Sequence, residues 1–158
     1  MKKFIFAMAA LIVMAACSYS SAEAETKSGA EEVAFEVAKN YFFKNNQAIP
    51  ASPKITTEEE FRKLFGMATT MGEDGKPTPI DFSKQFVLAI VQPVTDIATE
   101  IVPKKVMEKG DTLFYDYDVK VGQKQSFSIQ PISIIILDKR YSVREVLLCP
   151  SATPEAIK

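Results

Sequence analysis

Asp116 and Asp118 are the two acidic side chains whose spacing could support chemistry. They stand two residues apart in a segment that alternates apolar and polar residues, so a β-strand would direct both carboxylates to the same side. Paired carboxylates of this kind can serve a glycosidase or bind Ca²⁺. The solvent-exposed face of a half-buried strand produces the same spacing, and we favour this structural interpretation.

The absence of histidine restricts other kinds of catalysis. It removes the usual general base near neutral pH, the commonest transition-metal ligand, and both Ser-His-Asp and Cys-His catalysis. Ser126, Ser128 and Ser133 therefore have no histidine to activate them. We expect a binding or structural protein rather than an enzyme, with no cofactor and no metal site.

The bulk composition is that of one globular domain, with 47% hydrophobic and 25% charged residues. A leader that carries Lys2 and Lys3 would leave 17 basic and 20 acidic residues, a net charge of −3. This balance offers no electrostatic surface for nucleic acid.

Residues 1–16 have the charged start and short apolar run of a bacterial secretory signal, and the run is too short for a comfortable transmembrane helix. The run ends in Val-Met-Ala-Ala before Cys17, which resembles a lipobox with Met14 in place of the usual Leu. We favour lipidation of Cys17, so that the lipid is the chain's one contact with the membrane. The alternative is ordinary cleavage after Ala24, which gives a secreted or periplasmic protein.

Cys149 has no partner in the chain under either interpretation of the leader. We expect it to be a small buried hydrophobe at the end of a strand. A reactive thiol is the alternative, but activation normally needs an adjacent base or cation.

The rest of the chain divides into a flexible tether at 17–30, a single β-barrel domain at 31–150 and a disordered tail at 151–158. Residues 31–46 fit either a strand or a helix, and we favour a strand that ends in a turn at Asn45 and Asn46.

A two-turn helix is predicted to follow Thr56 or Thr57, either of which can cap it, with Glu59 or Glu60 closing a capping box. Three apolar residues share one face of this helix and should plug the end of a sheet or barrel: Phe61, Leu64 and Phe65. Gly66 is predicted to end the helix as its C′ residue.

Strand patterns fill the sequence after residue 80. Residues 86–91 form a continuous apolar run, which indicates a strand buried on both faces. Pro103 predicts an edge or a bulge. Turns are predicted at 109–111, 122–124 and 138–140, and Pro150 should end the last strand. About six strands with one short α-helix indicate a mainly β fold, either a small antiparallel β-barrel or a curled meander.

Residues 67–79 cannot be regular structure because two glycines and two prolines interrupt them. The segment is either a plain connection or a presented binding loop, which its length and exposed methionines favour. The candidate binding residues are Met67, Ala68, Thr69, Thr70 and Met71.

Four stretches resemble a group of small secreted lipoproteins of Gram-negative bacteria. They are AKNYFFKN (38–45), ITTEEEFRKLFGMATTMG (55–72), GKPTPIDFSKQFVLAIV (75–91) and QPISIIILDK (130–139). The group includes the potempins, compact β-barrel inhibitors of secreted proteases. The resemblance implies a protease inhibitor in the cell envelope, as an outer-membrane lipoprotein on its periplasmic or outer side, with a secreted metallo- or serine protease as partner.

Two other functions remain open on the sequence alone. A barrel with an unfilled interior would suit a carrier of small ligands. An accessory or structural envelope lipoprotein would have no soluble ligand.

Overall fold

Two antiparallel strands with almost no polar residues lie at the centre of the molecule. They are β6 (Gln85–Val91) and β9 (Ile132–Asp138), which pair along their whole lengths. The computed structural model describes residues 29–69, 72 and 75–151. Alternate side chains of β6 enter two different hydrophobic cores, so Phe86 and Leu88 face one core while Val87 and Ala89 face the other. The prediction of a strand buried on both faces is therefore confirmed.

The described strands form three hydrogen-bonded sheets. The first sheet has the order β1 (Glu31–Val33), β7 (Thr95–Lys109), β8 (Thr112–Ile129) and β10 (Glu145–Ser151). The second sheet has the order β2 (Glu36–Val37), β9, β6 and β4 (Lys54–Ile55). The third pairs β3 (Tyr41–Phe43) with β5 (Phe65–Met67). Among the helices of the described residues are α1 (Glu58–Leu64) and the 3-10 helix η2 (Lys139–Tyr141).

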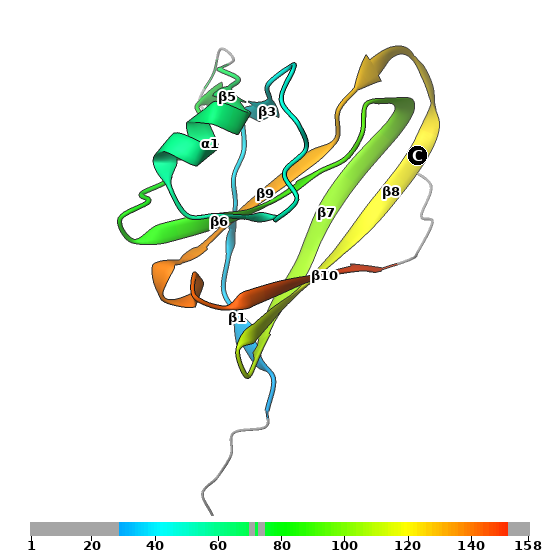
Figure 1. Cartoon of the computed structure of the whole chain (residues 1–158). Helices are drawn as coiled ribbons and strands as arrows, with labels where there is room; N and C mark the ends of the chain where they lie inside the picture. The colour runs from blue at the N-terminus through cyan, green and yellow to red at the C-terminus, as the bar shows by residue number, and fades with distance from the viewer. Residues whose placement is uncertain (1–28, 70–71, 73–74, 152–158) are drawn as a thin grey trace, which may run out of the picture.

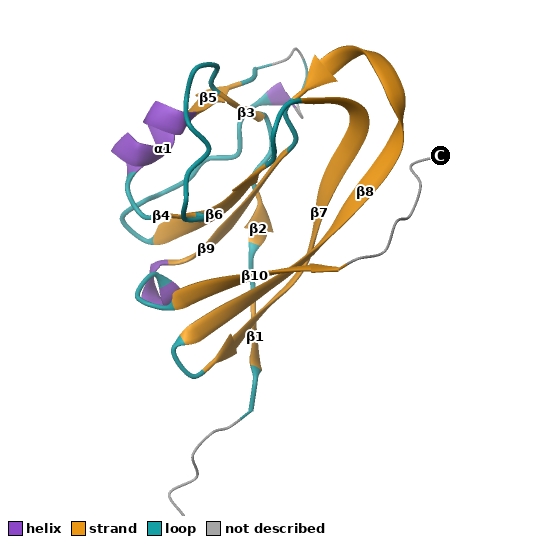
Figure 2. Cartoon of the chain, turned by 45° about the vertical axis from the view of Figure 1, so that its right-hand side comes forward, coloured by secondary structure: helices purple, strands orange, loops and turns teal. Residues whose placement is uncertain are grey.

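Each face of the central β2-β9-β6-β4 sheet is covered by a different layer (Figures 1 and 2). The β1-β7-β8-β10 sheet covers one face, and its contribution to the shared core includes Val106, Leu113 and Tyr115. Helix α1 with β3 and β5 covers the other face through Phe43, Phe61, Leu64 and Phe65. We call this second cover the cap layer. The burial predicted for Phe61, Leu64 and Phe65 is confirmed, although Phe65 belongs to β5 and not to the helix.

A mainly β fold with one α-helix is confirmed, but the predicted closed barrel is not found in the described part of the chain. The described residues form ten strands, rather than about six, in three sheets that do not join edge to edge. The last strand also departs from a meander because β10 pairs in parallel with β8. The reason is that β10 is not joined to β8 by a hairpin: the chain passes from β9 in one sheet through η2 to the edge of the other sheet. Pro150 lies within β10, where an edge strand tolerates it.

The N-terminal strand predicted for residues 31–46 is divided into β1, β2 and β3, which join three different sheets. Asn40 separates β2 from β3 with a left-handed backbone at φ 63°. The turn at Asn45 and Asn46 is confirmed, and Asn46 also has a left-handed backbone, with φ 65°.

Two predictions about the long β7–β8 ribbon had opposite outcomes. A shift in register between Pro103 and Lys105 confirms the irregularity expected at the proline. The turn predicted at 122–124 is wrong, because β8 runs through it and Lys124 pairs with Ile97. Register shifts in β7 on both sides of Ile97 accommodate this stretch, so the ribbon bends without ending.

The start of α1 was predicted correctly, whereas its end was not. Thr57 caps the helix by accepting a hydrogen bond from the Glu60 amide at 3.3 Å. Gly66 is not a C′ residue, because the chain is already extended at Phe65 and continues into β5. Gly66 instead lies under the ring of Phe42, the residue opposite it on β3, and a Cβ atom at Gly66 would collide with that ring.

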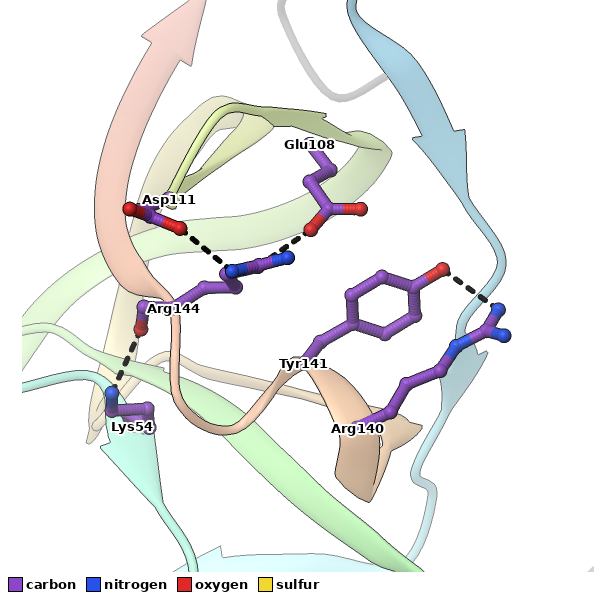
Figure 3. A network of polar contacts seen from close by, with 6 residues as sticks. All are labelled: Lys54, Glu108, Asp111, Arg140, Tyr141 and Arg144. Carbon is purple, nitrogen blue, oxygen red and sulfur yellow. Dashed lines mark hydrogen bonds and ion pairs between the residues drawn. The ribbon is translucent and has the colours of Figure 1, made fainter. Parts of the chain in front are cut away.

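Arg144, which directly precedes β10, binds the turn that joins the end of β7 to the start of β8 (Figure 3). Its guanidinium donates to Glu108 at 2.6 Å and to Asp111 at 2.7 Å. Its backbone carbonyl accepts a hydrogen bond of 2.8 Å from Nζ of Lys54 on β4. One residue therefore ties the parallel edge strand to both large sheets.

We predict that Leu64→Ala lowers the free energy of unfolding by about 2–5 kcal/mol, because it opens a cavity between α1 and the central sheet. The neighbouring Lys63 is exposed on the same helix, so Lys63→Ala should change stability by no more than about 0.5 kcal/mol. Urea unfolding followed by circular dichroism measures both. Equal losses for the two variants would show that α1 does not pack as described.

Candidate functional site

The candidate loop begins on β5 rather than in irregular chain. Met67 is the last residue of β5 and pairs with Tyr41 on β3. The Ala68 amide then donates to the Asn40 carbonyl at 2.9 Å. The prediction that residues 67–79 lack regular structure is therefore wrong at Met67, because β3 supplies a neighbouring strand that sequence periodicity does not reveal.

The returning leg of the loop is held at the same place. The Asn40 side-chain amide donates to the Lys76 carbonyl at 2.9 Å, and the Tyr41 hydroxyl donates to the Thr78 carbonyl at 2.6 Å. Thr78 and Lys39 also exchange two hydrogen bonds, of 3.0 and 3.2 Å. Both legs of the loop thus meet on residues 39–41.

Asn40 is suited to this junction by its backbone as well as by its side chain. Its φ of 63° lies in the left-handed region, which Asn tolerates better than most residues. This backbone lets the Asn40 carbonyl bind the outgoing leg while its side-chain amide binds the returning leg. We call residues 39–41 the loop clamp.

The structure describes three of the five predicted binding residues, and two of them, Met67 and Ala68, pair with the clamp. Met67 has 61% of its surface exposed, Thr69 is exposed and Ala68 is half-buried. Thr70 and Met71 lie outside the described residues, as do Cys17, the 1–16 signal, most of the tether and residues 152–158 of the tail.

A groove of about 590 Å³ borders the clamp within the cap layer. Four aromatic side chains from β3, α1, β5 and the approach to β6 line it: Tyr41, Phe61, Phe65 and Phe82. Phe61 is the centre of this cluster, with ring centroids 5.0 Å from Phe65, 5.1 Å from Tyr41 and 5.6 Å from Phe82. The groove was not predicted from the sequence, although a signal that could have indicated it is the close spacing of Pro77, Pro79, Ile80 and Phe82.

The charged residues of the groove come from both turns of α1 and from Lys44, which directly follows β3. Arg62 forms an ion pair with Glu58 at 2.6 Å, and both line the groove. Lys44 lines it as well, and its Nζ donates to the Arg62 carbonyl. The Lys44 amide binds the Leu64 carbonyl at 2.8 Å, so Lys44 satisfies two carbonyls that the helix end leaves open.

Asp116 and Asp118 occupy structural positions on β8. Asp118 is 8% exposed and pairs with Lys104 at 2.7 Å, while Asp116 pairs with Lys105 at 3.5 Å. Both lysines belong to the neighbouring strand β7. Within the residues that the structure describes, no group of three or more His, Cys, Asp or Glu side chains could hold a metal ion.

Cys149 lies on β10 opposite Asp116 and is half-buried, so the expectation of a fully buried thiol is wrong. Partial burial raises the pKa of the Cys149 thiol, and the Asp116 carboxylate raises it further. A raised pKa lowers the thiolate fraction near neutral pH, which is the reverse of what a reactive cysteine needs.

Comparison with known proteins found no matching protein-family model, no curated protein and no solved structure. In the part of the chain that is described, no helix has the length and apolarity needed to span a membrane.

We predict that Asn40→Gly loosens the loop without unfolding the domain. Glycine accepts the left-handed backbone but removes the donor to the Lys76 carbonyl, so cleavage of the loop by an added protease should become about threefold to tenfold faster. The matched control is Asn46→Gly, because Asn46 has the same left-handed backbone but follows β3 and is not part of the clamp. Equal cleavage rates in the two variants would contradict the clamp.

Proposed function

We propose that this chain is a secreted, lipid-anchored binding protein that inhibits an extracellular protease through residues 67–69 and the loop that they begin. The observation that carries the proposal is the loop clamp, which holds both legs of the loop on residues 39–41. The two legs of the loop are then fixed relative to the core before a protease binds.

Such fixing is what an inhibitory segment needs. A segment that is already ordered loses little conformational entropy when it enters a cleft, so more of the contact energy becomes affinity. Met67 offers an exposed, flexible apolar side chain at this point. Strand β5 pairs only with β3 among the described strands, and an extended segment of a protease could add to it as a further strand.

The position of the first described strand supports an anchored inhibitor. The first described strand, β1, lies at the opposite end of the molecule from α1, β3 and β5 (Figure 1). A lipid on Cys17 would then leave the loop directed away from the membrane. We propose the outer membrane of a Gram-negative cell as the site of anchorage. We also propose that the curled part expected from the sequence corresponds to the bent β7–β8 ribbon.

The small-ligand carrier with a barrel lumen receives less support. The space between the two large sheets contains buried apolar side chains that include Phe86, Leu88, Leu113, Tyr115 and Ile135. An accessory envelope lipoprotein without inhibitory activity is the outcome that a negative inhibition test would favour.

The experiment assays the mature chain, made without its leader, against the metallo- and serine proteases that the source bacterium secretes. We expect stoichiometric inhibition of at least one protease, with uncleaved inhibitor recovered from the complex. Replacing residues 67–71 by Gly and Ser should abolish inhibition, whereas Asn46→Gly should preserve it. Inhibition that survives the replacement would make the loop a connector, and failure against every secreted protease would refute the proposed function.

A further inference from the structure

We propose that the groove in the cap layer binds an amphiphile with one carboxylate and an apolar tail, of the kind represented by a medium-chain fatty acid. This ligand site does not depend on protease inhibition. Three features of the groove support such a ligand: its aromatic lining, the difference in charge between its two ends and its concave shape.

The lining provides the apolar contact area. Phe61 and Phe65 are stacked and almost fully buried, so they form a fixed floor, and Tyr41 and Phe82 flank Phe61. Pro79 adds a rigid apolar wall. A hydrocarbon chain in the groove removes from water its own surface and the apolar surface that Tyr41, Pro79 and Phe82 leave exposed.

The charged end of the groove provides a partner for a carboxylate. Arg62 is already paired with Glu58, but Lys44 forms no ion pair with any described residue. The Lys44 ammonium has three donor hydrogens and uses one on the Arg62 carbonyl. The charged side chains of the lining therefore carry one net positive charge, which an anionic head group would compensate.

The apolar end lies at the opposite end of β3. Tyr41 and Met67 form one cross-strand pair and Phe43 and Phe65 another, after which the chain reaches Lys44. Three residues of extended strand span about 10 Å, so the head and the tail of one ligand can occupy the two ends together.

The concave shape of the groove suits a small molecule better than the flat surface of a protein partner. A volume of about 590 Å³ is within the range of sites that enclose most of the surface of a small ligand. A medium-chain carboxylate matches both the volume and the arrangement of charge.

The test uses 11-(dansylamino)undecanoic acid, whose emission increases in apolar surroundings, titrated into the mature chain at pH 7.5. Decanoic acid and decanol then compete for the site. We expect saturable binding of the probe and displacement by decanoic acid at a concentration about fivefold to tenfold lower than by decanol, because only the acid can pair with Lys44.

Lys44→Met should reduce this preference to about twofold or less, while the exposed Lys63→Met should leave it unchanged. Because Lys44 also caps α1, Met67→Glu provides a second variant at the exposed apolar end, and it should weaken both competitors. The proposal is overturned by an absence of saturable binding, by equal displacement by acid and alcohol, or by a preference that persists in Lys44→Met. Neither competitor requires a protease, so this result is separate from the inhibition assay.

Discussion

Burial of the central β2-β9-β6-β4 sheet on both faces is the constraint on which the rest of the structure depends. Strands β6 and β9 have apolar side chains in both directions, so water must be kept from each face. The long β7–β8 ribbon covers one face, and the cap layer covers the other. The cap layer is therefore a structural requirement, whatever it also binds.

The candidate functions all follow from how the cap layer is built. Phe61 and Phe65 seal the central sheet and also form the floor of the groove, so the groove is fixed by the core. Strand β3 pairs with β5, and the residues just before and within β3 form the clamp for both legs of the loop. The cap layer therefore both holds the loop and lines the groove.

Local signals in the sequence were sufficient for several features. The apolar run at 86–91, the Thr57 cap and the irregularity at Pro103 each arise from a few neighbouring residues, and each was predicted correctly. Strand alternation placed Asp116 and Asp118 together and both pair with lysines on β7, but the expected solvent-exposed face is wrong at Asp118, which is buried against Lys104.

Other features depend on residues that are distant in sequence. Gly66 is a residue type that commonly ends a helix. Here it lies in β5, where the ring of Phe42 on β3 leaves no room for a side chain. Gly122 lies inside β8 because β7 opposite it shifts register. The parallel pairing of β10 depends on the path of η2 between sheets, and the groove requires four segments to meet. Pattern and propensity in one segment carry no information about such pairings.

Hydrogen exchange at the amides of Ala68 and Thr78 tests the central claim most directly. These amides donate to the Asn40 and Lys39 carbonyls at 2.9 and 3.2 Å. If the cap layer holds both legs of the loop, both amides should exchange at least about a hundredfold more slowly than in an unstructured chain. Exchange at the unprotected rate, while the Val87 amide in β6 stays protected, would show that the loop is not fixed to the core.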